Sequence, residues 1–284
     1  MVAPVALLTV AIVVYPVCYS LYLSLTSSNP ITGNTRFVGL QNYSTALADG
    51  EFWRTLGLTL FYVVCVTVLG TLVALGSALL LRERFFGRRL LMAVIVLPWA
   101  LSTYAAAVVF RYVYSPQFGI AATVTEQAGG TPVNFLDSST VIPALAVVHA
   151  WQFAPLGAYF LLATLQMVPE DLYKLAKVDG MGLMQRFQRV TLPYIRLPLA
   201  IFLVLVGGQA ATAFDLIYFL TSGGPGGSSR TLPFFIYETT FQDRRLGSGA
   251  AMSWILLVVV VALTVAYYAF AMRTGHKQRR EDES

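Results

Sequence analysis

Long apolar runs constrain the fold of this chain more than any other feature of its sequence. Several of them extend beyond about 18 residues, the length that is typical of a membrane span. None alternates apolar and polar residues as the strands of a membrane barrel do. A helix satisfies its own backbone hydrogen bonds in lipid, so we predict an all-α integral membrane protein with six transmembrane helices. The predicted spans are about 4–25, 55–81, 88–113, 141–167, 194–220 and 248–272.

The spans leave no room for a separate soluble domain, so we predict one transmembrane domain over residues 1–284. Charged residues make up only 12% of the chain, against about 25% in soluble domains. The first run has no basic start and no small-residue cleavage site, so we do not expect it to be a signal peptide. The net charge of +5 comes from basic residues at the ends of the spans, which does not indicate a nucleic-acid partner.

The distribution of Lys and Arg predicts the orientation in the membrane. The segments on one side of the spans hold 13 of these residues, and the segments on the other side hold five. The richer set is 82–89, 174–196 and 273–284, and the poorer set is 26–54, 114–140 and 221–247. Because basic loops remain on the cytoplasmic side, we predict that both termini are cytoplasmic and that 273–284 is a flexible cytoplasmic tail.

A polar and basic segment, 168–193, separates the fourth span from the fifth. Glu170 lies where the positive end of a helix dipole favours a carboxylate. Gly180 is the residue type that usually ends a helix in a left-handed conformation. A second amphipathic run, 184–192, ends at Pro193. The segment therefore predicts a helix, a glycine turn and a second helix, all outside the spans.

The spacing within this segment carries a family resemblance. The chain reads Lys174-Leu175-Ala176, three residues, Gly180, nine residues and Val190-Thr191-Leu192-Pro193. This resembles the cytoplasmic motif of permease subunits of bacterial ABC importers, which is Glu-Ala-Ala, three residues, Gly, nine residues and Ile-x-Leu-Pro. Lys174 and Leu175 depart from the family's Glu and Ala. Asp179 before the glycine and Phe187 beyond it resemble the carbohydrate branch, of the maltose-transporter type.

The resemblance implies partners and roles. It implies a multi-pass protein of the bacterial inner membrane that works with a second permease subunit, two ATPase subunits and an extracytoplasmic solute-binding protein. The segment 168–193 would dock on an ATPase and is called the coupling segment below. Its expected ATPase-coupling residues are Glu170, Leu172, Lys174, Leu175, Ala176, Asp179, Gly180, Phe187 and Pro193.

The chain lacks the features of an ATPase or a metalloenzyme. No Gly-rich loop ends in Gly-Lys-Ser or Gly-Lys-Thr, so we expect ATP and Mg to bind the partner ATPase subunits and no cofactor to bind this chain. His149 and His276 are isolated in the sequence, and no metal-ligand cluster or catalytic constellation is recognisable. We therefore predict a transporter subunit rather than an enzyme, with no catalytic residues and no metal.

Polar side chains inside the spans are candidates for a substrate pathway, because such residues are unfavourable in lipid unless they serve a function. Four of them recur every third residue and are predicted to share one face of span five. The candidates are Gln209, Thr212, Asp215 and Tyr218 in span five, Trp151, Gln152 and Tyr159 in span four, and Tyr104 and Arg111 in span three. Sugars need hydroxyl partners and flat apolar faces, which these residue types provide.

Each candidate also has a simpler interpretation. Tyr and Trp near span ends commonly anchor a helix at the membrane interface. Gln and Thr commonly form hydrogen bonds between helices. Arg111 is expected either to extend toward the outer surface or to pair with Asp215.

Two functions remain open from the sequence. The first is the pathway subunit of an ATP-driven importer for a sugar or related solute, such as a polyol or glycerol phosphate, working by alternating access. The alternative is a secondary transporter driven by an ion gradient. That mechanism usually places several carboxylates in mid-membrane, whereas Asp215 is the one acidic residue inside the predicted spans.

Overall fold

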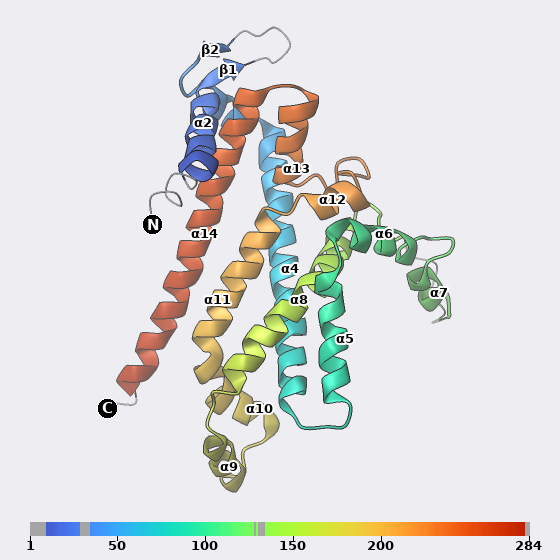
Figure 1. The fold of residues 1–284 in the computed structure, drawn as a ribbon, viewed down its shortest axis with the longest axis vertical. Coiled ribbons are helices and arrows are strands. Elements are labelled where there is room, and N and C mark those ends of the chain that lie inside the picture. The colour runs from blue at the N-terminus through green and yellow to red at the C-terminus, as the bar shows by residue number, and fades with distance from the viewer. Residues whose placement is uncertain (1–9, 29–34, 128, 130–133, 282–284) are drawn as a thin grey trace. The chain divides into compact units, whose positions relative to one another are not determined.

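The computed structural model describes residues 10–28, 35–127, 129 and 134–281 (Figure 1). The chain divides into two compact units. Unit 1 comprises 1–59 and 230–262, and unit 2 comprises 60–229 and 263–284. Two long helices, α4 (Gly50–Arg82) and α14 (Leu246–Glu281), begin in unit 1 and continue into unit 2.

Unit 1 contains the only two strands among the described residues, together with short helices. Its elements are η1 (Val10–Val14), α2 (Tyr15–Ser24), β1 (Thr26–Ser28), β2 (Thr35–Phe37), α3 (Gln41–Ala48), α13 (Leu232–Tyr237) and η3 (Glu238–Gln242). The strands pair antiparallel, with Thr26 opposite Phe37. Asn42 fixes the chain before them by donating hydrogen bonds of 2.9 Å to the carbonyls of Ser24 and Thr26. The apolar core is formed by Ala46, Phe52, Leu56, Leu232, Phe235, Met252 and Leu256.

Unit 2 is a bundle of helices around α4, α8 and α11. Its elements are α5 (Arg88–Ala100), α6 (Thr103–Val113), α7 (Ile120–Gln127), α8 (Val141–Leu165), α9 (Glu170–Val178), α10 (Leu183–Arg186), η2 (Phe187–Thr191), α11 (Leu192–Ala211) and α12 (Asp215–Leu220). The buried core combines small and large side chains, which allows close helix packing in lipid. It consists of Ala74, Ala78, Leu81, Ala154, Leu161, Leu162, Leu165, Ile195, Phe202 and Val206.

The structure supports a membrane-spanning protein with four or five apolar spans among the described residues. Four helices are long and apolar enough to cross a membrane: Gly50–Arg82, Val141–Leu165, Leu183–Ala211 and Leu246–Ala266. A fifth span exists if α5 and α6 are taken together. The first predicted span, 4–25, is described only from residue 10, where η1 and α2 form a shorter apolar helix. The count of six helices therefore stays a prediction.

The span predicted over 88–113 is not one continuous helix. The axes of α5 and α6 differ by 100° across a break at Leu101 and Ser102. Pro98 lies in the last turn of α5, where its missing N–H and its ring weaken the helix. Ser102 is extended and accepts a hydrogen bond of 3.2 Å from the Ala105 N–H, so it caps a new helix.

The prediction of one continuous helix over 194–220 is also wrong. Helix α11 ends at Ala211, and α12 begins only at Asp215. Gly207 and Gly208 lower the helix propensity just before the break. The Thr212 hydroxyl donates back to the Gly208 carbonyl at 3.1 Å, which competes with continuation of the helix. The four polar residues spaced by three therefore do not form a stripe on one helix.

Pro193 does not end the helix that precedes it. A π-helical turn, η2, leads directly into α11, in which Pro193 occupies the first turn. The chain before Pro193 is therefore already helical, and the proline does not terminate it. Helices α10, η2 and α11 thus form one continuous path from the coupling segment into the membrane span. At the other end of the chain, α14 extends to Glu281, so the predicted tail 273–284 is helical up to that residue.

Candidate functional site

The coupling segment consists of a helix, a glycine turn and a second helix. Helix α9 follows Pro169 and carries Glu170 in its first turn. It ends at a left-handed Gly180, which has a φ of +72°. The N–H of Met181 donates to the Ala176 carbonyl at 3.0 Å, which closes the end of the helix. Glycine adopts this backbone conformation without a steric penalty, so the residue type accounts for the turn.

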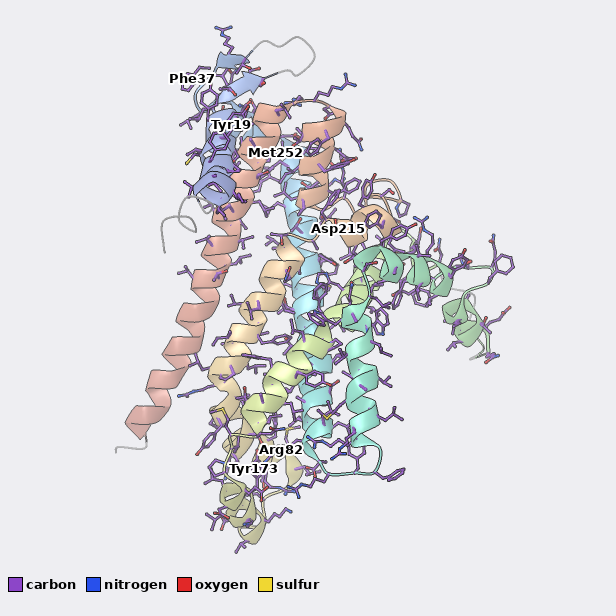
Figure 2. All side chains as sticks on the ribbon, in the orientation of Figure 1. Tyr19, Phe37, Arg82, Tyr173, Asp215 and Met252 are labelled. Carbon is purple, nitrogen blue, oxygen red and sulfur yellow. The ribbon has the colours of Figure 1, made fainter. Side chains whose placement is uncertain are left out.

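Two side-chain contacts attach α9 to the rest of unit 2. The Tyr173 hydroxyl lies 2.8 Å from the Thr191 hydroxyl, which joins α9 to η2. The Arg82 guanidinium lies 3.9 Å from the centroid of the Tyr173 ring, which joins the last residue of α4 to α9 (Figure 2). A cation over an aromatic ring is attracted by the negative face of the ring. A displacement of α9 would therefore act on both α4 and α11.

The predicted coupling residues differ in exposure. Ala176 is buried in this chain, and Leu172, Phe187 and Pro193 are half-buried. Glu170, Lys174, Leu175, Asp179 and Gly180 are exposed. Along α9, Ala176 therefore packs inward while its neighbour Leu175 faces outward.

Apolar side chains on both sides of Gly180 are exposed. They are Leu175, Val178, Leu183 and Met184, and are called the turn patch below. Val178 is 85% exposed and Leu183 is 80% exposed. Large apolar groups at this exposure are typical of a surface that binds another protein or a membrane.

One ion pair forms on the surface of α9. The Lys174 ammonium donates to the Asp171 carboxylate at 2.7 Å. The hydrogen bond and the charge of Lys174 lower the pKa of Asp171, and Asp171 in turn raises the pKa of Lys174. Both groups are exposed to solvent, so the pair contributes little to stability. The Lys that replaces the family's Glu is thus held by a neighbouring carboxylate.

At the far end of unit 2, the structure brings several candidate pathway residues onto two adjoining helices, α6 and α12 (Figure 1). Arg111 of α6 donates hydrogen bonds to the carbonyls of Phe219, at 2.9 Å, and Leu220, at 3.3 Å. The Tyr104 ring contacts the Phe219 ring edge-on, with centroids 5.1 Å apart. Asp215 and Tyr218 lie on α12 and are exposed.

Trp151 reaches the same pair of helices from α8. Its ring contacts the ring of Phe110 on α6, with centroids 5.1 Å apart. Arg111 satisfies carbonyls at the end of α12, and none of the ion pairs among the described residues joins it to Asp215. Of the two expectations for Arg111, the pairing with Asp215 is therefore not the one observed.

Two other candidates tie α8 to α5 instead. Gln152 is buried and donates to the Leu101 carbonyl at 3.0 Å, which satisfies the backbone at the bend. The Tyr159 hydroxyl donates to the Met92 carbonyl at 2.6 Å. Gln209 and Thr212 lie exposed at the end of α11. The nine predicted pathway residues thus separate into an α6–α8–α12 group, a helix-joining pair and the end of α11.

The structure also shows a buried polar contact that the sequence did not indicate. The Tyr62 hydroxyl on α4 lies 2.7 Å from Nδ1 of His149 on α8, and both side chains are buried. The two residues are 87 positions apart, so no local pattern could have paired them. Among the residues that the structure describes, no group of three His, Cys, Asp or Glu side chains is arranged to hold a metal ion.

Replacing Arg111 with alanine is expected to loosen α12. The change removes two charge-assisted hydrogen bonds to the C-terminal end of that helix, a loss of about 1–2 kcal/mol after allowance for solvent exposure. Amide hydrogen exchange in α12 should therefore become roughly 5- to 30-fold faster. Arg111→Lys keeps the charge but not the forked donor geometry, so it should give an intermediate rate. Unchanged exchange in the alanine variant would show that Arg111 does not hold α12.

Comparisons with known proteins agree with this architecture. The trehalose/maltose transport system permease protein of Thermococcus litoralis is 31% identical over 94% of this chain and 90% of its own length. The trehalose transport system permease protein of Mycobacterium tuberculosis is 32% identical over 94% of this chain and 86% of its own. The sn-glycerol-3-phosphate transport system permease protein of Agrobacterium fabrum is 29% identical over 97% of this chain and 94% of its own length.

A solved structure shares the fold. A chain of a bacterial alginate ABC transporter, crystallised with its alginate pentasaccharide-bound periplasmic protein, matches with a TM-score of 0.83 over 97% of this chain and 93% of that chain. The sequence identity of that pair is 21%, so the match shows the fold alone.

The family model described as binding-protein-dependent transport system inner membrane component matches residues 67–276, which include the coupling segment and most of the spans. The match confirms the resemblance seen in the sequence and does not favour the ion-gradient alternative. With its apolar helices, the protein is a multi-pass component of the inner membrane. The chain belongs to the family of binding-protein-dependent transport system inner membrane components.

Proposed function

We propose that this chain forms part of the translocation pathway of an ATP-driven importer for a sugar or related solute. The similarity to permeases of trehalose, maltose and glycerol-3-phosphate systems over more than nine-tenths of the chain carries this proposal. The substrate would be a sugar, an oligosaccharide, a polyol or a glycerol phosphate. The chain would import it together with a second permease subunit, two ATPase subunits and an extracytoplasmic solute-binding protein.

The proposed orientation places the coupling segment and both termini in the cytoplasm. The excess of Lys and Arg on that side of the spans supports it. ATP and Mg would bind the ATPase subunits, and this chain would hold no cofactor. The turn patch would then face the compartment in which the ATPase subunits lie.

The mechanism would be alternating access. Closure of the ATPase subunits around ATP would move the coupling segment, and the favoured conformation of the spans would shift with it. The contacts of Tyr173 with Arg82 and Thr191 support this coupling, because they attach α9 to α4 and to the path into α11. A rigid attachment transmits displacement better than a free loop does.

Substrate would pass near α6, α8 and α12. Tyr104 and Tyr218 are exposed there and offer hydroxyl groups, and Trp151 and Tyr104 offer aromatic faces. Asp215 and Arg111 add charged hydrogen-bonding groups. The combination suits a solute that carries several hydroxyl groups.

Replacing Val178 with aspartate is expected to separate the chain from its ATPase. Val178 is 85% exposed, so the change leaves the fold intact but places a charge in the turn patch. A buried, unpaired charge at an interface weakens binding by about 2–5 kcal/mol, which is at least roughly 30-fold. The measurement is a pull-down of tagged chain from mild detergent, with ATPase activity assayed in the eluate.

The matched control is Phe118→Asp. Phe118 is 87% exposed and lies outside the coupling segment, so this variant adds the same charge at another exposed apolar position. Wild type and Phe118→Asp should retain the ATPase activity, and Val178→Asp should lose it. An eluate without ATPase activity for all three chains would count against the ATP-driven mechanism, and equal retention by all three would count against docking at the turn patch.

A further inference from the structure

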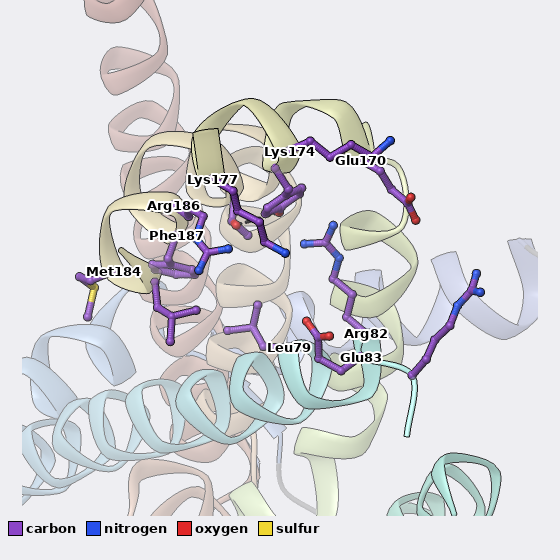
Figure 3. A pocket seen from close by; sticks show the side chains of 13 residues that line it. Leu79, Arg82, Glu83, Glu170, Lys174, Lys177, Met184, Arg186 and Phe187 are labelled. Atoms are coloured by element: carbon purple, nitrogen blue, oxygen red, sulfur yellow. Dashed lines mark hydrogen bonds between the residues drawn. The ribbon is translucent and has the colours of Figure 1, made fainter. Parts of the chain in front are cut away.

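A cavity of about 900 Å³ lies between the end of α4 and the coupling segment (Figure 3). Five cationic side chains line it: Arg82, Arg84, Lys174, Lys177 and Arg186. Two carboxylates, Glu83 and Glu170, also line it, so the cations outnumber the acids. Since all of these residues belong to unit 2, the cavity is a property of one compact unit.

The cations differ in their partners. Lys174 is paired with Asp171, and Arg82 lies over the Tyr173 ring. The ion pairs found within the described part of the chain do not include Lys177 or Arg186. Figure 3 shows the side chains of Arg82, Lys177 and Arg186 directed into the space between α9 and the end of α4.

Arg186 lacks a hydrogen-bond acceptor for one of its side-chain nitrogens in the part of the chain that the structure describes. Its Nε atom is buried and has no hydrogen-bond partner among the described residues. A buried donor without an acceptor is unfavourable, and this is most pronounced for a charged group. An anion in the cavity would accept this hydrogen bond, and Lys177, which also lines the cavity, would supply a second cation.

Part of the cavity lining is apolar. Leu79, Leu183 and Phe187 contribute to its lining. Leu79 belongs to the last apolar turns of the α4 span, so the cavity lies at the level where the hydrophobic part of that helix ends. Basic pockets next to apolar surface at the end of membrane helices suit the phosphate groups of anionic lipids.

We propose that this cavity binds a phosphate-bearing anion. Arginine and lysine bind phosphate through short, charge-assisted hydrogen bonds, and several cations around one cavity select an anion over a neutral solute. Two sources share this chemistry: the headgroup of an anionic phospholipid and a soluble phosphate ester. An anion held by Lys177 and Arg186 bridges α9 to α10. This site is separate from the substrate pathway at α6, α8 and α12.

The test measures binding directly on the purified full chain, with any subunits that remain attached. Native mass spectrometry compares retention of phosphatidylglycerol with retention of phosphatidylcholine. The variant is Lys177→Gln with Arg186→Gln, and the control is Arg189→Gln with Arg196→Gln, which removes two charges from the same region at residues that do not line the cavity. Thermal unfolding of both variants in detergent verifies that the fold is kept. A second arm titrates glycerol phosphate and inorganic phosphate and follows the intrinsic fluorescence.

The expected result is that the Lys177 and Arg186 variant binds phosphatidylglycerol at least about tenfold more weakly, while the control changes by less than about threefold. A different pattern would assign the site to a soluble ester. In that pattern the Lys177 and Arg186 variant loses glycerol phosphate binding, the control keeps it, and the wild-type chain does not retain phosphatidylglycerol selectively. Three outcomes would overturn the proposal. The two variants could lose binding equally, neither variant could change binding, or the wild-type chain could retain the two lipids equally and bind no phosphate. None of these readouts measures substrate uptake or ATP hydrolysis, and inorganic phosphate and phosphatidylglycerol are not among the proposed substrates, so failure of this proposal and failure of the proposed function are distinguishable.

Discussion

Replacing Gly180 with valine is expected to reduce coupled substrate uptake at least about fivefold. Gly180 has a φ of +72°, where a β-branched residue is a genuine outlier. The strain of about 1–2 kcal/mol would favour another backbone conformation at the end of α9. No atom lies within 4 Å of the position that a Cβ would occupy, so no packing holds the turn in its present form. The turn patch on either side of it would be displaced.

Gly180→Asn is the matched control. Asparagine adopts left-handed conformations more readily than other residues with a Cβ, so the turn should keep its shape and uptake should remain within about twofold of wild type. Uptake and ATP hydrolysis are measured together in proteoliposomes that contain the whole transporter. A valine variant that transports at the wild-type rate would show that the geometry of this turn is not needed for coupling. Impaired uptake in both variants would point instead to the open space around Gly180.

Where the sequence predicted the structure well, the signal was local. Gly180 was predicted to end α9 from its residue type alone, and it has the positive φ that this requires. The ends of α4 and α8 were predicted to within about five residues, because a helix that crosses a membrane needs an apolar run of about its own length.

Where the prediction failed, hydrophobicity concealed a break. The runs 88–113 and 194–220 are predominantly apolar, yet each contains local signals that end a helix. Ser102 is a good N-cap, and Thr212 donates to its own preceding turn. The length of each apolar run outweighed these local signals, so each run was predicted to form a single helix. The spacing of Asp215 from Thr212 therefore carried no information about a shared face.

Contacts between distant residues could not be predicted at all. Arg82 and Tyr173 are far apart in the sequence, and so are Tyr62 and His149. Basic residues such as Arg186 were informative for orientation, which depends on their number and not on their neighbours. Their convergence around a cavity depends on how the coupling segment folds back onto α4, which only the structure shows.

Replacing Gly157 with alanine is expected to destabilise unit 2. A Cβ at Gly157 on α8 would clash with Cζ of Phe202 on α11 and would lie 2.9 Å from the Cβ of Ala74 on α4. Phe202 is itself buried in the core of the unit, so its ring has little freedom to move away. Inserting a methyl group into a packed core typically destabilises by about 1–3 kcal/mol, and the value here should lie at the upper end of that range. The measurement is thermal unfolding of the purified chain in detergent.

A control variant and a rescue of the Gly157→Ala variant can both be made on these helices. Gly76→Ala on α4 places a methyl group where no atom lies within 4 Å, so the melting temperature should not fall. Phe202→Leu removes the clashing part of the ring, so in combination with Gly157→Ala it should destabilise by less than the two single changes added together. Strict additivity would mean that the close approach of α8 to α11 is not the cause. Because α11 continues directly from the coupling segment, a loosened contact at Gly157 should also lower the uptake obtained per ATP hydrolysed, even at temperatures at which the chain remains folded.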